Sequence, residues 1–193
     1  MVTDAGATTH DDRATTHDGA PADPACALAR GEQADPSDGR RLVAVFDSPV
    51  AGHLLHFARD CGWGTTLLEP RGSDAATHAA GYADVLLTAT DVRQFDENMD
   101  VVVTDHDREE LGEIVRDLLA AHPRWVGVMG SPRHAAPHVP ALRELGVPDE
   151  TIARVHRPIG LNIGSRSPAE IALATLAGLI ADRRDRPGGF EFG

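Results

Sequence analysis

The sequence predicts an α/β fold: a Rossmann-like, doubly wound and mainly parallel sheet in a single domain, preceded by a disordered N-terminal tail. Short apolar runs rich in β-branched residues, such as LVAVF at 42–46 and VVVT at 101–104, are typical of strands buried on both faces. Between such runs lie segments whose apolar residues recur at helical spacing, as in 108–122. Strands that alternate with helices favour a parallel sheet.

The other elements follow from the same two periodicities and from turn residues. HLLHFARDCGW at 53–63 has helical spacing, ends at Gly62 and carries Cys61 on its apolar face, so Cys61 is expected in the core. SPAE at 167–170 is a capping signal that starts a helix running to 184. The remaining expected elements are strands at 65–69, 83–89 and 125–129, a helix at 140–145 and a helical turn at 150–155.

Both ends of the chain differ from its middle. Residues 1–40 are Ala, Asp, Thr, Gly, Pro and His with almost no large aliphatic side chains, and ATTHD occurs at 7–11 and again at 14–18. A segment with so little to bury does not offset its ordering entropy, so we expect a disordered, acidic, low-complexity tail. The folded domain is expected at 41–187, with a short C-terminal tail at 188–193.

The composition excludes several classes of protein. Thirty acidic residues face 18 basic ones, all arginine, and the net charge of −12 disfavours nonspecific binding to nucleic acid or anionic membrane. Adaptation to high salt and a codon bias toward GC both explain this balance. Two cysteines exclude a disulfide scaffold and a four-cysteine zinc site. No apolar run is long enough for a bilayer span and no secretory signal is visible, so a cytoplasmic location is expected.

In a doubly wound sheet, ligands bind beyond the carboxyl ends of the strands, near the point where the strand order reverses. The loop after the first strand reads DSPVAGH at 47–53. Pro49 removes a backbone amide and Asp47 brings negative charge, so this loop is not expected to bind the pyrophosphate of NAD in the usual way. Glu69 ends the second strand. It either holds a ribose hydroxyl or merely solvates the strand end.

The fourth strand is followed by an imidazole between two carboxylates. Asp105, His106 and Asp107 suit acid–base chemistry, because a carboxylate orients and stabilises a charged ring, and they also suit metal ligation. Alternatively, Asp105 or Asp107 caps a helix that begins near Arg108.

Two further segments have the composition of an anion site. After the fifth strand, small residues let the backbone approach a ligand and an arginine supplies a planar fork for phosphate or carboxylate. HRPIGLNIGSRSPAE at 156–170 adds glycines, hydroxyls and two arginines before a helix, an arrangement that suits an anion. The candidate cofactor-binding residues are Gly130, Ser131, Arg133, His156, Arg157, Gly160, Asn162, Gly164, Ser165 and Arg166, together with Glu69.

These segments resemble a known family. HRPIGLNIGSRSPAEIALATLAGLI at 156–180 is similar to the closing signature of the XdhC/CoxI family, and WVGVMGSPRH and VVVTDHDREEL resemble segments that precede it. The likeness covers about 42–184. It implies a Rossmann domain of factors that bind the molybdenum cofactor (molybdopterin or its nucleotide form) and insert it into a hydroxylase apoenzyme such as xanthine dehydrogenase or carbon monoxide dehydrogenase. A homodimer is also allowed.

The sequence departs from the family pattern at two places. The first loop of the family reads close to GAGHVA, whereas this chain has DSPVA, one residue shorter and without either glycine. Residues 1–40 lack the glycine-rich, cysteine-bearing motif of longer members, so a cysteine-based sulfur transfer is not expected. Two alternatives stay open: an NAD(P)-dependent oxidoreductase that uses the same crevice, and an interaction module that has lost its ligand.

Overall fold

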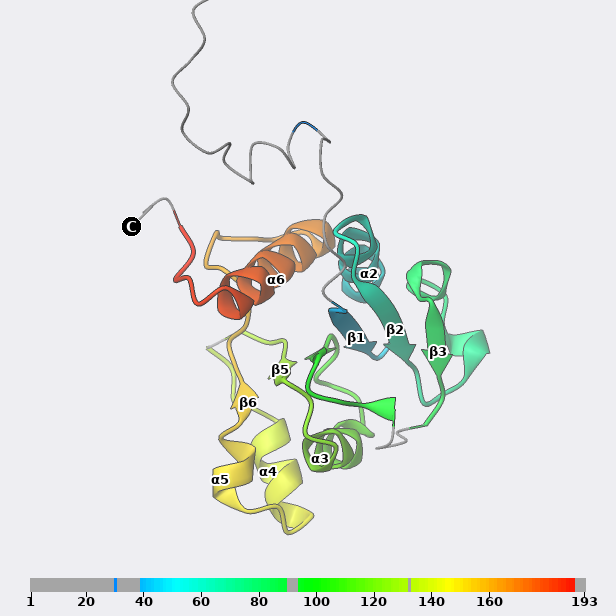
Figure 1. Cartoon of the computed structure of the whole chain (residues 1–193). Coiled ribbons are helices and arrows are strands. Elements are labelled where there is room, and N and C mark those ends of the chain that lie inside the picture. The colour runs from blue at the N-terminus through cyan, green and yellow to red at the C-terminus, as the bar shows by residue number, and fades with distance from the viewer. Residues whose placement is uncertain (1–29, 31–38, 90–93, 132, 190–193) are drawn as a thin grey trace, which may run out of the picture. The chain divides into compact units, whose positions relative to one another are not determined.

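The computed structural model describes residues 30, 39–89, 94–131 and 133–189. Within these residues the chain forms one parallel sheet of six strands in the order β3-β2-β1-β4-β5-β6 (Figure 1). The order reverses between β1 and β4, as the Rossmann-like prediction requires. The strands are β1 (Arg41–Val45), β2 (Gly64–Leu68), β3 (Val85–Leu87), β4 (Met99–Val103), β5 (Trp125–Val128) and β6 (Val155–His156).

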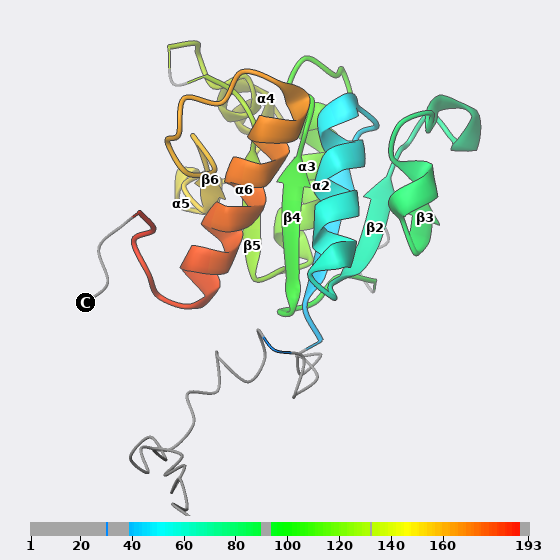
Figure 2. The ribbon, with the colours of Figure 1, turned by 90° about the horizontal axis from the view of Figure 1, so that it is seen from above.

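Helices cover both faces of the sheet. Figure 2 shows α2 and α6 side by side in front of the strands, with α3 behind them. The helices are α2 (Pro49–Asp60), α3 (Leu111–Ala120), α4 (His138–Glu144), α5 (Asp149–Ile152) and α6 (Pro168–Arg183), with two 3-10 turns, η1 (Ser73–Ala75) and η2 (Ala80–Tyr82).

The sheet separates two apolar cores, because successive side chains of a strand point to opposite faces. In β1, Leu42 and Ala44 pack with α2 and α6, whereas Val43 and Val45 pack with α3 and α4. All four side chains are fully buried. The apolar runs in the sequence therefore correctly indicated strands that are covered on both faces.

Some details differ from the sequence-based expectations. The segment 150–155 does not form a single helical turn: α5 ends at Ile152 and the chain continues into β6, a sixth strand that we did not predict. The helix expected at 108–122 begins only at Leu111. Cys61 is exposed rather than in the core, because α2 ends at Asp60 and Cys61 occupies its C-cap.

The ends of α2 and α6 at the carboxyl edge of the sheet are fixed by caps. The Ser48 hydroxyl accepts the Ala51 amide at the start of α2, and Ser167 and Glu170 form the complete capping box expected for α6. The expected tails fall largely outside the described residues, which begin, apart from Arg30, at 39 and end at 189. Among the described helices, none has the length and apolarity needed to cross a bilayer.

Candidate functional site

The loop that leaves β1 lies at the switch point of the sheet and has an unusual backbone. Phe46 is fully buried and has a φ of 70°, the left-handed region that bulky residues rarely occupy. Thr104, which follows β4, holds this turn: its hydroxyl lies 2.8 Å from the Phe46 carbonyl and 3.1 Å from the Val45 carbonyl. The Ser48 hydroxyl donates to Thr104 at 3.0 Å. The turn is therefore tied to both central strands.

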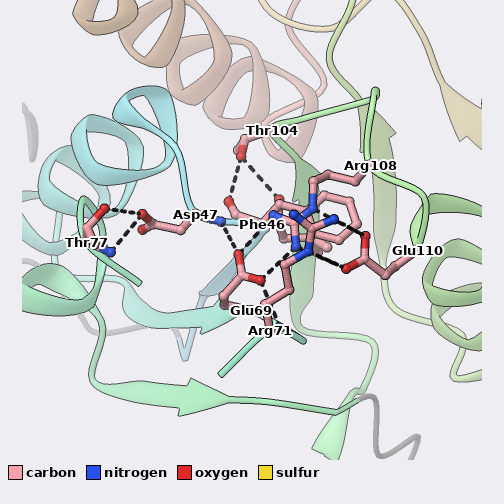
Figure 3. A network of polar contacts seen from close by, with 9 residues as sticks. Phe46, Asp47, Glu69, Arg71, Thr77, Thr104, Arg108 and Glu110 are labelled. Carbon is pink, nitrogen blue, oxygen red and sulfur yellow. Dashed lines mark hydrogen bonds and ion pairs between the residues drawn. The ribbon is translucent and has the colours of Figure 1, made fainter. Parts of the chain in front are cut away.

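Beside this turn lies a buried ion pair between Glu69 and Arg108 (Figure 3). The Glu69 side chain is fully buried, and each carboxylate oxygen accepts one bond from Arg108, at 2.8 and 3.2 Å. The amides of Asp47 and Arg71 donate to the same two oxygens at 2.8 and 3.0 Å. The Arg108 guanidinium also lies 4.5 Å from the centre of the Phe46 ring, a cation–π contact.

The electrostatics of this cluster keep its acids ionised. Burial alone would raise the pKa of Glu69, but the hydrogen bonds from Arg108 and two amides leave that pKa below its ordinary value. Bonds from Arg71 and then Arg108 lower the pKa of Glu110 to about 2. The Arg108 pKa is raised by its bond to Glu69. Glu69 does not solvate the strand end, and a ribose hydroxyl would reach it only by displacing these bonds.

Asp47, in the loop between β1 and α2, anchors the segment that precedes β3. Its carboxylate accepts the backbone amides of Thr77, His78 and Ala79 at 2.8–2.9 Å, which fastens the loop before β3 over the start of α2. A Cβ on Gly52 would come within 2.7 Å of the His78 carbonyl oxygen, so this approach needs a glycine. The Asp47 carboxylate is therefore occupied by the protein's own amides.

The Asp105–His106–Asp107 segment forms a turn beyond β4. The Asp107 amide donates to Asp105 at 3.0 Å, and the His106 ring nitrogen Nε2 lies 3.8 Å from Asp107, too far for a hydrogen bond. Because α3 begins at Leu111 and has no side-chain cap, the alternative that Asp105 or Asp107 caps it is wrong. Within the described residues, no three His, Cys, Asp or Glu side chains are grouped to hold a metal. Acid–base chemistry at His106 stays a prediction.

Arg157 joins two of the predicted segments. It follows β6, and its guanidinium donates to the carbonyls of Ser131 and Ala135 at 3.2 and 2.8 Å, in the loop after β5. Gly130 lies directly against it, because a Cβ there would come within 2.8 Å of the guanidinium carbon. Arg133 and Arg166 are exposed. The structure thus brings together Gly130, Ser131 and Arg157, and within the part of the chain that it describes no contact gathers the three arginines.

The rest of the 156–170 segment divides between packing and surface. His156 points to the opposite face from Arg157 and stacks on Trp125, with ring centres 4.8 Å apart. Gly160 packs on the backbone of α6: a Cβ added at Gly160 would lie 3.1 Å from the carbonyl carbon of Ala174. Asn162 and Gly164 are exposed, and Ser165 is half-buried.

The amides at the start of α6 are already partly used. Those of Arg166 and Ser167 donate to the Glu170 carboxylate at 2.8 and 3.1 Å, and these bonds hold the pKa of Glu170 below its ordinary value. An external anion would therefore have to displace Glu170 to reach these two amides.

Sequence reasoning missed Arg71, Arg108, Glu110 and the acceptor role of Asp47. Arg108 comes directly after Asp107, a predicted site residue. Its partner Glu69 lies 39 residues away, at the end of another strand. The sequence did hold one signal for this pair. An acid stands at the end of one predicted strand, and an arginine follows another strand of the same sheet.

Comparison with known proteins gives this fold a family. The model of the XdhC Rossmann domain matches residues 42–179, most of the chain. The chain belongs to the XdhC family. It is 35% identical over 118 residues to YqeB of Escherichia coli K12, described as uncharacterized, covering 61% of this chain and 20% of that protein. A solved structure from Bacillus halodurans, described as a xanthine dehydrogenase, matches with a TM-score of 0.59 and 26% identity, covering 79% of this chain and 45% of that one. The chain therefore spans a fifth of the first relative and less than half of the second.

The structure clarifies how this XdhC domain departs at its first loop. Phe46 adopts the backbone conformation that glycine adopts without strain. The loop DSPVA at 47–51 thus follows a residue with a strained backbone, and its departure from the family pattern stays a prediction from the sequence.

Proposed function

We propose that this XdhC domain is an accessory protein that binds a molybdopterin-type cofactor and assists its insertion into a hydroxylase of the xanthine dehydrogenase or carbon monoxide dehydrogenase type. Family membership supports the maturation role. The observation that carries the binding role is the junction of two arginine-bearing loops at the carboxyl edge, where Arg157 bonds to the Ser131 carbonyl on a chain with a net charge of −12. Local positive charge on an acidic protein selects an anionic ligand.

The residues at this edge fit a phosphate-bearing group. Gly130 gives the backbone a close approach, and the exposed Arg133 and Arg166 supply charge-assisted donors from two neighbouring loops. In this proposal the amides near Gly130 and Ser131, and those of Gly164 and Ser165, complete the phosphate contacts. Arg157 holds the two loops together. The cofactor, when bound, supplies the molybdenum centre for the client enzyme.

His106 occupies the neighbouring position after β4. Its side chain is 27% exposed, so a ligand lying across the ends of β4 and β5 would meet it. We assign it, with Asp105 and Asp107, to the reactive end of the ligand.

The contacts disfavour the NAD(P) alternative. Pro49 has no amide, the Ala51 amide is used by Ser48, and Asp47 places a carboxylate beside the start of α2. Glu69 has all its acceptor bonds filled. A dinucleotide would therefore lack both its pyrophosphate amides and its ribose acceptor.

Isothermal titration under anaerobic conditions, with cofactor released from a molybdenum hydroxylase, tests the proposal. We expect saturable micromolar binding that weakens about tenfold or more in the R133Q/R166Q variant, because each charge-assisted bond contributes about 1.5–3 kcal/mol. R184Q is the matched control, since Arg184 is an exposed arginine at the far end of α6. The absence of saturable binding, or equal losses in both variants, would overturn the proposal.

A further inference from the structure

A cavity of about 500 Å³ lies beside β6, on the side covered by α4 and α5. Its apolar wall is formed by Val139, Ile152, Val155 and Pro158. This volume falls within the range of about 300–1,000 Å³ that is typical of small-molecule sites. The cavity can therefore hold the apolar body of a small organic molecule.

Two buried nitrogen atoms at this cavity have no hydrogen-bond partner among the residues that the structure describes. His138 is only 3% exposed, and its Nδ1 atom makes no hydrogen bond. The Nε atom of Arg157 is also buried and unpaired, although the two terminal nitrogens of that guanidinium are bonded. A buried polar group left unpaired costs about 1–3 kcal/mol, so such groups usually have a partner. Both residues line the cavity, which places two unsatisfied groups beside a space large enough for a ligand.

The charges around the cavity favour an anion. Arg143 and Asp149 neutralise one another through a 2.8 Å bond. Among the described residues that line the cavity, this leaves Arg157 as the charge without an ionic partner, with His134 and His138 as further donors. Burial and the neighbouring Arg157 lower the pKa of His138, so that its ring is neutral at pH 7 and can donate from Nδ1.

We propose that this cavity is a binding site for a small organic anion, with an apolar body against β6 and α5 and one oxyanion group at His138 and Arg157. The oxyanion is a carboxylate or a phosphate monoester, which share the acceptor geometry that the two donors require. A bound oxyanion accepts from Nδ1 of His138 and from Nε of Arg157 once these side chains turn toward the cavity, because both atoms are covered in the structure. The apolar body replaces water against Val139 and Ile152.

This site goes beyond the proposed cofactor function. Its lining does not include Gly130, Ser131, Arg133 or His106, and it lies along β6 rather than across the ends of β4 and β5. Arg157 is common to both, because one side of its guanidinium supports the loop after β5 while Nε stays unpaired.

Histidine-ring NMR of the full chain tests the site, with phenyl phosphate, benzoate, inorganic phosphate and benzyl alcohol as probes. We expect phenyl phosphate or benzoate to shift the His138 ring signals saturably and to raise its pKa, since a bound anion stabilises the protonated ring. The better of the two anions identifies the oxyanion. Inorganic phosphate and the neutral benzyl alcohol should bind at least about tenfold more weakly, because each lacks one half of the interaction.

Variants separate this site from the cofactor site. H138N should weaken anion binding about tenfold, whereas H53Q, which removes an exposed histidine on α2, should leave it unchanged. R133Q/R166Q should retain anion binding here and lose cofactor binding, so the two proposals fail separately. No saturable shift of His138 in the wild-type protein, equal binding of benzyl alcohol, or full affinity in folded H138N would overturn the proposal.

Discussion

Replacing Glu69 by glutamine tests whether the buried ion pair stabilises the fold. Each carboxylate oxygen accepts two N–H groups, from Arg108 and from the backbone at Asp47 or Arg71. An amide nitrogen cannot accept, so one of these donor pairs would face another donor. Removing one partner of a buried pair typically costs about 3–5 kcal/mol. At roughly 2–4 °C per kcal/mol for a chain of this length, the melting temperature should fall by about 6–20 °C.

Thermal and urea unfolding followed by circular dichroism measure this change. E109Q is the matched control, because Glu109 is an exposed acid on the same turn and its replacement should change stability by no more than about 0.5 kcal/mol. A melting temperature for E69Q equal to that of E109Q would refute the assignment of Glu69 to the structure. Glu69 would then be available for a ligand.

Three further outcomes follow from the geometry. F46G should be more stable than F46A, reversing the usual cost of glycine, because the left-handed φ of Phe46 strains any residue with a Cβ; equal unfolding midpoints would contradict this. G127A should lower the free energy of unfolding in urea by about 1–3 kcal/mol, because the added methyl group collides with the ring of Trp125. Wild-type stability of this variant would contradict the prediction and show that the Trp125 ring moves aside without cost. Stability should fall on acidification in two stages, because both folded pKa values are lowered and the unfolded chain therefore takes up protons first. The His138 stage begins below the ordinary pKa of about 6.5, and the Glu110 stage runs from about 4.5 down to about 2. Urea midpoints of H138Q that keep the first stage would contradict the assignment to His138.

The sheet was predictable because its signal is local. Apolar runs that are covered on both faces need no partner to be recognised, and the capping box of α6 lies within four residues. β6 was missed because two residues carry no periodicity and its pairing with β5 depends on a distant segment. Cys61 was misplaced because a helix face says nothing about where the helix ends.

The site was less predictable because its interactions connect separate strands. Gly130 and Arg157 were both identified from their loops, and adjacent parallel strands explain why they meet. Glu69 was identified from its position at the end of a strand. Its partner Arg108 follows another strand, so the sequence alone did not show that the two form an ion pair. The unsatisfied Nδ1 of His138 becomes visible only when burial and neighbours are known.

Amide chemical shifts of the labelled protein, recorded with and without the molybdenum cofactor, test the central proposal most directly. We predict that the largest changes occur at Gly130, Ser131, Gly164 and Ser165, with smaller ones at the turn of His106. Changes centred on the amino ends of the strands, or no changes at a saturating cofactor concentration, would contradict a cofactor site at the carboxyl edge.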